Sequence, residues 1–323
     1  MIRLVTDDLR PPGGPPKRHL LSVGDLTRDD VERLLGTART FEASLERHVK
    51  KLPTLKGHLI VNLFYESSTR TSSSFELAAK RLSADTVTLR ASGSSVEKGE
   101  SLKDTALTLS AYDPDVIVLR HPEAGAAELV ARLTNARVVN AGDGKHQHPT
   151  QALLDLYTLR NTFGRLDGLQ VAIVGDVAHS RVARSLVQAL NLVGSQAILV
   201  GPPALLPPGI GPTSHDIQAI ADVDVIYVLR MQRERILEGA NFVPSLGEYS
   251  RRYGITAARV RPGQFVMHPG PINRGVELDG DVADSEASLV LEQVRAGLVV
   301  RMAILYDLLT AGPVAVEATV ETA

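Results

Sequence analysis

Short apolar segments alternate along this chain with stretches whose apolar residues recur at helical spacing. The segments that resemble strands are residues 58–65, 116–119, 138–140, 169–174, 197–200, 223–229 and 265–267. This alternation is typical of parallel sheets, because each strand is joined to the next by a helix that crosses the sheet. The sequence therefore predicts an α/β fold with doubly wound parallel sheets.

The chain length indicates two domains, since 323 residues is about twice the usual length of one domain. A helix opening at Pro149 follows one series of strands and precedes another, so we expect the boundary there. The first domain would comprise residues 17–148 and the second residues 149–298, with an active-site cleft between them. Residues 1–16 are rich in proline and glycine and are expected to form a disordered tail.

Two helices are predicted at the ends of the folded part. The first begins after Thr27, which reads as an N-cap with Asp30 three residues later. The last is expected over residues 285–309, and its part from about 299 to 310 would pack back on the first domain. Its predicted apolar face comprises Leu291, Val294, Leu298, Met302 and Leu305.

The composition excludes several classes of protein. The 35 basic and 37 acidic residues give a net charge of −2, so no general attraction to nucleic acid or anionic lipid is expected. The absence of cysteine rules out disulfides, thiolate zinc sites, iron–sulfur clusters and cysteine nucleophiles, and it fits a reducing cytoplasm. No apolar run approaches the roughly 18 residues of a membrane span, and no signal peptide is evident. We therefore expect a cytoplasmic protein without nucleic-acid or membrane partners.

The segment Ser-Thr-Arg-Thr at residues 68–71 follows the first strand and opens a helix. Ligands of open α/β sheets bind beyond the carboxyl ends of the strands. Hydroxyls, a guanidinium and free N–H groups at a helix start suit a phosphate dianion. The alternative, a capping cluster beside a surface arginine, explains one hydroxyl but not three.

Further hydrogen-bond donors follow the next strands of the first domain. Arg120 ends one strand, and His148 and Gln151 stand at the start of the helix near residue 149. His146 and His148 suggest a metal pair, but no carboxylate sits at ligand spacing and no thiolate exists, so no metal is expected. We instead interpret His148 as a neutral imidazole that donates a hydrogen bond to a carbonyl oxygen.

In the second half, Arg181 and Arg230 follow two strands and are expected to bind two carboxylates of one small ligand. A dinucleotide fold would need a G-x-G-x-x-G turn, whereas Gly175 stands alone before its helix. A phosphate compound in one domain and a carboxylate compound in the other, meeting at a cleft, indicate group transfer.

The motifs together resemble the transcarbamoylase family from about residue 17 to residue 309. The segments that carry the resemblance are Ser-Thr-Arg-Thr at 68–71, Val-Glu-Lys-Gly-Glu-Ser at 96–101, Arg-His-Pro at 120–122, His-Pro-Thr-Gln at 148–151, Gly-Asp at 175–176 with Ser-Arg at 180–181, Arg-Met-Gln at 230–232 and His-Pro-Gly-Pro at 268–271. The resemblance implies transfer of the carbamoyl group of carbamoyl phosphate to the amine of L-aspartate, a step of pyrimidine synthesis. It implies no metal and no organic cofactor.

The resemblance also implies a role for each matching residue. Phosphate would be held by Ser68, Thr69, Arg70 and Thr71, and Arg120 would span the phosphate and the carbonyl oxygen. That carbonyl would be polarised by Thr71, Arg120 and His148. Gln151 and the Gly270 carbonyl, beside Pro271, would bind the carbamoyl amine. The aspartate site would comprise Lys98, Arg181, Arg230 and Gln232. Ser72 departs from the family pattern, which commonly has a basic residue at this position.

Assembly and partners are implied by the same resemblance. Ser94 and Lys98 match positions that reach into a neighbouring subunit's site, so a homotrimer with shared active sites is expected. A regulatory chain or a dihydroorotase partner is compatible with it. Two alternatives remain open: a transcarbamoylase for another amino acid such as ornithine, and a noncatalytic two-lobed binding or scaffold relative. The ornithine enzymes carry a His-Cys-Leu-Pro segment, whereas this chain has no cysteine.

Overall fold

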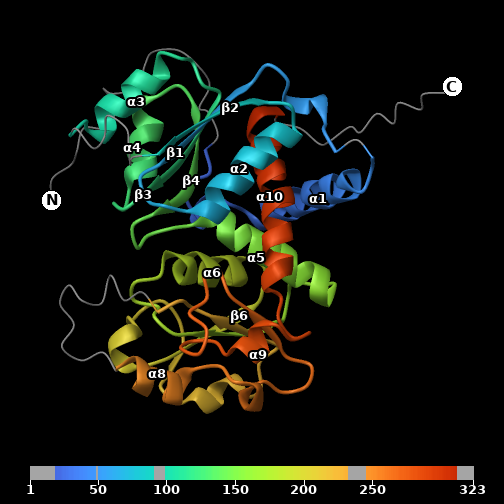
Figure 1. Cartoon of the computed structure of the whole chain (residues 1–323), viewed down its shortest axis with the longest axis vertical. Coiled ribbons are helices and arrows are strands. Elements are labelled where there is room, and N and C mark those ends of the chain that lie inside the picture. The colour runs from blue at the N-terminus through green and yellow to red at the C-terminus, as the bar shows by residue number, and fades with distance from the viewer. Residues whose placement is uncertain (1–18, 49, 91–98, 232–244, 311–323) are drawn as a thin grey trace.

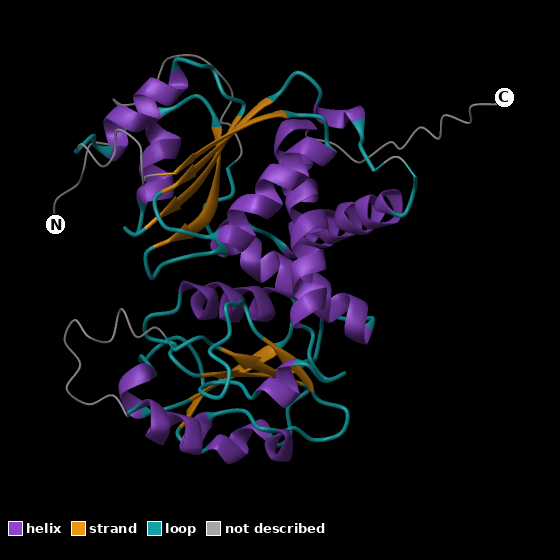
Figure 2. Cartoon of the chain, viewed as in Figure 1, coloured by secondary structure: helices purple, strands orange, loops and turns teal. Residues whose placement is uncertain are grey.

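The computed structural model describes residues 19–48, 50–90, 99–231 and 245–310 (Figure 1). The described strands form two separate parallel sheets, with strand orders β2-β1-β3-β4 and β7-β6-β5-β8-β9. Helices cover both sheets, as Figure 2 shows. The predicted α/β fold with two parallel sheets is confirmed.

The first sheet contains β1 (Leu59–Phe64), β2 (Asp85–Arg90), β3 (Val116–His121) and β4 (Arg137–Asp143). Its helices are α1 (Arg28–Leu45), α2 (Thr69–Arg81), α3 (Leu102–Ser110) and α4 (Ala126–Leu133). Alternate residues of each strand face opposite sides. Ile60 and Val118 therefore pack in the core with α1 and α2, while Val61 and Ile117 pack with α3 and α4.

The second sheet contains β5 (Gln170–Val174), β6 (Gln196–Val200), β7 (Thr213–Ser214), β8 (Val225–Val228) and β9 (Phe265–Met267). The helices α6 (Arg181–Leu192), α8 (Leu246–Tyr253) and α9 (Gly280–Ala283) come after β5, β8 and β9 in the sequence, respectively. Short 3-10 turns lie at Val23–Asp25, Pro53–Leu55, Pro203–Leu205, Ile217–Ile220 and Ala257–Arg259.

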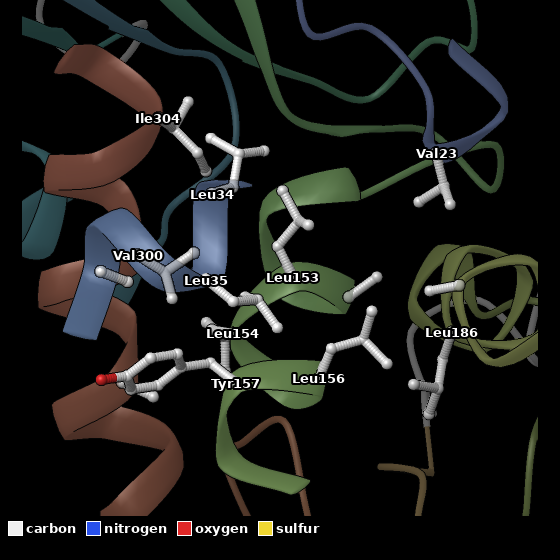
Figure 3. Packing of buried hydrophobic residues seen from close by; sticks show 14 of the residues in the cluster. Val23, Leu34, Leu35, Leu153, Leu154, Leu156, Tyr157, Leu186, Val300 and Ile304 are labelled. Carbon is white, nitrogen blue, oxygen red and sulfur yellow. The ribbon is translucent and has the colours of Figure 1, made fainter. Parts of the chain in front are cut away.

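Two helices connect the sheets. Helix α5 (Pro149–Phe163) lies between them, and α10 (Val290–Thr310) runs from the second sheet back to α1 and α2 (Figure 1). Leu153 and Leu156 of α5 lie among side chains from α1, α6 and α10, as Figure 3 shows. One continuous apolar cluster therefore joins both halves of the molecule, and α5 carries polar residues from its first turn into their junction.

The predicted start of the first helix is confirmed, whereas the predicted start of the last helix is wrong. Thr27 caps α1 in a reciprocal capping box with Asp30, as its spacing predicts. The last helix begins at Val290 rather than at residue 285. The preceding segment is held beside β9 instead, because Val266 donates to the Ala287 carbonyl and accepts from the Leu289 N–H. Backbone groups paired with a strand are not available to a helix.

The apolar face predicted for that helix is only partly correct. Met302 and Leu305 are buried, but Leu291 and Val294 are 68 % and 51 % exposed. Val294 borders the cavity described below. Strands β2 and β7 were not anticipated, because their sequences are mostly polar and lack an apolar run. No helix within the described residues is both long and apolar enough to span a membrane.

Candidate active site

A cavity of about 1130 Å³ opens between the two sheets, at the carboxyl ends of their strands. Its wall carries six arginines, namely Arg70, Arg120, Arg181, Arg230, Arg295 and Arg301. Glu66 is the one carboxylate among the described lining residues. This excess of positive charge favours ligands that carry several negative charges.

The N-terminus of α2 forms one wall. Ser68 stands at the N-cap position, yet its side chain makes no capping hydrogen bond. The first N–H groups of the helix therefore remain available to a ligand, next to the Ser68 and Thr69 hydroxyls and the exposed Arg70. The capping alternative predicts a hydrogen bond from the helix to the Ser68 side chain, and the described structure shows none. Ser72 is buried behind the loop.

Glu66 links arginines from both halves of the molecule. Its Oε2 lies 3.1 Å from Arg120 Nε and also accepts from Arg181 Nη2. Arg181 additionally donates to the Gly144 carbonyl at 3.2 Å and is only 6 % exposed. Gly142 permits this approach, since a Cβ there would lie 2.8 Å from Arg181 Nε. These bonds thus hold Arg181, at the start of α6, against the segments that follow β1 and β4.

His148 lies at the start of α5, buried within the cavity wall. Burial, followed by the charges of Arg120, Arg181 and Arg301, lowers its pKa well below the usual value. The ring is therefore neutral at physiological pH. Thr150 Oγ1 lies 3.4 Å from Nδ1, an arrangement that fits a tautomer with the proton on Nε2. Such an imidazole can donate to a carbonyl oxygen without carrying a charge.

A buried polar cluster lies behind Gln151. The Asp155 carboxylate accepts from Gln151 Nε2 at 3.1 Å, from Gln293 Nε2 at 2.7 Å and from the Tyr227 hydroxyl at 2.8 Å. Burial raises the pKa of Asp155 to about 7, although these three donors act in the opposite direction. The backbone N–H of His268 donates to Gln293 Oε1 at 2.9 Å, which connects the cluster to the turn after β9.

That turn carries Gly270 and Pro271 into the cavity. His268 Nδ1 accepts the Gly270 N–H at 2.8 Å, so its proton lies on Nε2, 3.3 Å from Glu277 Oε1. Burial lowers the pKa of His268, and the charges of Arg70 and Arg230 act in the same direction, whereas Glu277 acts in the opposite one. The conformation of this turn is therefore fixed by hydrogen bonds to buried side chains.

Most of the residues singled out in the sequence meet in this cavity. Those that line it are Ser68, Thr69, Arg70, Thr71, Arg120, His148, Gln151, Arg181, Arg230, Gly270 and Pro271. Ser94, Lys98 and Gln232 fall outside the described residues. His146 is not part of the lining, and its Nδ1 lies 3.0 Å from Asp143. Within the described ranges, no three His, Asp or Glu side chains gather in a way that could hold a metal ion.

Sequence reasoning gave no role to Glu66, Asp155 or Gln293. Asp155 follows Gln151 by one helical turn in a stretch that is otherwise apolar, and Gln293 interrupts an apolar pattern in the same way. A polar residue on a buried helix face is a signal that could have identified both. The pairing of Glu66 with two arginines has no such local signal.

Two family models match this chain. Residues 18–161 match the carbamoyl-phosphate-binding domain of aspartate/ornithine carbamoyltransferases, and residues 167–308 match their aspartate/ornithine-binding domain. The aspartate carbamoyltransferase catalytic subunit of Acidothermus cellulolyticus is 55 % identical over 303 residues, which cover 91 % of this chain and 93 % of that relative. The corresponding subunit of Thermobifida fusca is 55 % identical over 300 residues, covering 90 % and 95 %.

Solved structures of aspartate transcarbamoylases are also similar to this chain. The catalytic subunit of M. jannaschii aspartate transcarbamoylase superposes with a TM-score of 0.79 at 39 % identity, covering 90 % of this chain and 97 % of that one. Aspartate transcarbamoylase from Trypanosoma cruzi, in complex with carbamoyl phosphate and aspartate, gives a TM-score of 0.80 at 31 % identity, with coverage of 90 % and 95 %.

Proposed function

The chain belongs to the aspartate/ornithine carbamoyltransferase family, and we propose on that premise that it is an aspartate carbamoyltransferase. It transfers the carbamoyl group of carbamoyl phosphate to the amine of L-aspartate and releases N-carbamoyl-L-aspartate and phosphate. The relatives named above are catalytic subunits of aspartate carbamoyltransferases, and a Trypanosoma cruzi homologue has been solved with both substrates. The pathway that this reaction serves is pyrimidine synthesis.

One observation carries the proposal. The open N-terminus of α2 with Arg70, at the first sheet, and Arg181 with Arg230, at the second, line the same cavity. The first group suits a phosphate and the second suits carboxylates. A site that places a phosphate compound next to a dicarboxylate brings an amine close to an acyl phosphate, which is the geometry that carbamoyl transfer requires.

We assign phosphate binding to Ser68, Thr69, Arg70 and Thr71, with Arg120 reaching both the phosphate and the carbonyl oxygen. The neutral amine of aspartate attacks the carbonyl carbon. The oxyanion that forms is stabilised by Thr71, Arg120 and His148, which are donors already in place before the reaction. The carbon–oxygen bond to phosphate then breaks, and the departing phosphate accepts the proton released by the amine.

The amine of the carbamoyl group is bound by Gln151 and by the carbonyl of Gly270, next to Pro271. Arg181, Arg230 and Gln232 hold the two carboxylates of aspartate, with Lys98 adding a further positive charge. Arg181 already pairs with Glu66, so aspartate meets a guanidinium whose direction is set in advance. Exclusion of water from the cavity protects carbamoyl phosphate from hydrolysis.

Domain boundaries and assembly are part of the same proposal. We place the carbamoyl-phosphate domain at residues 17–148, the aspartate domain at 149–298, and the helix end at 299–310 on the first domain. A homotrimer in which Ser94 and Lys98 serve the neighbouring site fits the edge position of β2, whose Val87 is 45 % exposed. The printed names of the relatives, catalytic subunits, suggest a separate regulatory partner. The absence of cysteine fits the cytoplasm.

Ornithine is the main competing substrate. Its side-chain ammonium would need an acidic partner in the cavity, since a buried unpaired charge is costly. Among the described lining residues the available carboxylate is Glu66, which already binds two arginines. The cavity therefore favours aspartate.

A steady-state assay tests the function directly. Purified protein is incubated with carbamoyl phosphate and either L-aspartate or L-ornithine, and the ureido product is measured. We expect carbamoyl aspartate to form and citrulline not to form. Turnover of ornithine would support the other branch of the family, and absence of both products would support the noncatalytic alternative.

A further inference from the structure

Asp155 lies behind the wall of the cavity, on the second turn of α5. Its carboxylate is fully buried and does not itself line the cavity. Its three donors come from three elements, because Gln151 belongs to α5, Tyr227 to β8 and Gln293 to α10. A buried carboxylate is costly unless its oxygens accept such bonds, so these contacts stabilise the charge and at the same time restrain the donors.

The first restrained donor is Gln151. An ionised carboxylate can only accept, so the Gln151 amide must turn its NH₂ group toward Asp155. Its Oε1 is then the acceptor that this side chain offers to a ligand. Without Asp155, either end of the amide would be free to face the cavity, and an NH₂ group there would repel a substrate amine.

The second restrained donor acts on the turn after β9. Gln293 also gives its NH₂ group to Asp155, so its Oε1 accepts the N–H of His268. The His268 ring in turn accepts the N–H of Gly270. Gly270, whose carbonyl is assigned to the carbamoyl amine, is therefore connected through its N–H to Asp155 by two side chains, both almost completely buried.

Both acceptors assigned to the carbamoyl amine thus depend on one carboxylate. We propose that Asp155 is a positioning residue that gives the site its selectivity for a carbamoyl –NH₂ over a methyl group. This inference rests on the proposed function, because it concerns the same substrate. Carbamoyl phosphate fills both acceptors with its amine hydrogens, whereas the methyl group of acetyl phosphate leaves them unpaired in a buried site, which costs affinity.

The test compares dissociation constants of carbamoyl phosphate, acetyl phosphate and inorganic phosphate at pH 8, where Asp155 is ionised. In Asp155→Leu, which has similar volume but no acceptor, we expect the ratio of the acetyl phosphate to the carbamoyl phosphate constant to fall at least about tenfold. The constant for inorganic phosphate should stay within about twofold, since the donors to Asp155 lie on α5, β8 and α10 and the phosphate loop lies on α2.

Two variants serve as matched controls. Asp155→Asn keeps an oxygen for both glutamines, and its NH₂ group can donate to the Tyr227 hydroxyl, so the ratio should stay within about threefold of that of the parent protein. Tyr227→Phe removes the donor to Asp155 Oδ2 but keeps both glutamine bonds to Oδ1, and its ratio should also stay within about threefold of that of the parent protein. A merely structural role for Asp155 would lower the affinity for all three ligands together.

A folded Asp155→Leu protein with the parental ratio would overturn the inference, as would an Asp155→Asn ratio that falls as far as that of the leucine variant. If Asp155→Leu does not fold, Gln293→Leu breaks the connection to His268 alone. The ratio should then fall severalfold, and an unchanged ratio refutes the inference. This test can be distinguished from a test of the proposed function, because the ratio of dissociation constants is measured without turnover and without aspartate.

Discussion

Gly270 and the guanidinium of Arg70 are close neighbours in the cavity wall, although the two residues follow strands of different sheets. Gly270 has a φ of +69°, and a Cβ at this position would overlap the guanidinium of Arg70. The turn whose carbonyl we assign to the carbamoyl amine therefore borders the residue assigned to the phosphate. One small substrate can therefore contact the Gly270 carbonyl and the Arg70 guanidinium at the same time.

Gly270→Ala should disturb this arrangement. The methyl group would displace Arg70, so we expect the affinity for carbamoyl phosphate to fall at least about tenfold while the protein remains folded. Gly263→Ala is the control, because Gly263 has a similar φ of +87° and nothing within 4 Å of the added Cβ. It should lower stability by about 1 kcal/mol through backbone strain, with no loss of affinity. Equal affinities in the two variants would contradict the contact.

Arg230→Ala should weaken aspartate binding selectively. The guanidinium is assigned to a carboxylate, so the KM for aspartate should rise by about a hundredfold, while calorimetry should find carbamoyl phosphate binding almost unchanged. Arg295→Ala removes the same charge from the rim of the cavity, where its side chain is 74 % exposed, and should change the KM little. Equal losses for both substrates would argue against separate subsites.

Shared active sites predict complementation between two inactive variants. Lys98→Ala and His148→Ala are mixed under conditions that let trimers dissociate and reassemble. If Lys98 serves the neighbouring site, hybrid trimers contain some sites free of both lesions, and part of the activity should return. Mixtures that stay inactive after proven subunit exchange would place Lys98 outside a shared site.

The neutrality of His148 predicts a pH dependence of stability. Its pKa is lowered in the folded state, so below about pH 6.5 the unfolded chain binds a proton that the folded protein does not. His148 therefore destabilises the folded protein progressively as the pH falls through 6.5.

Between pH 8 and pH 5.5 this effect is on the order of 1 kcal/mol. The free energy of unfolding of His148→Gln, measured by denaturant titration, should fall by that much less than that of the parent protein over the same interval. An identical pH dependence in both proteins would show that His148 gains a proton in the folded state.

Much of the site was predictable because strand ends are local features of a sequence. The apolar runs located β1, β3, β5 and β8, and polar residues at their carboxyl ends or in the connections that follow them form much of the cavity wall. The capping box at Thr27 was equally local. These features depend on residues a few positions apart, so periodicity and side-chain chemistry are sufficient to predict them.

Tertiary structure alone decided the rest. Edge strand β2 forms from the polar sequence Asp85–Arg90 because β1 offers a complete ladder of partners, not because of its own pattern. The direction of Arg181 is set by Glu66 and Gly144, and the orientation of Gln151 by a carboxylate shared with Tyr227 and Gln293. Local sequence patterns were sufficient to predict most of the chemical groups that reach the cavity, although not Glu66 and Gln293. Which group faces which was decided by folding, because hydrogen-bond partners from distant elements meet only after the sheets and helices have packed.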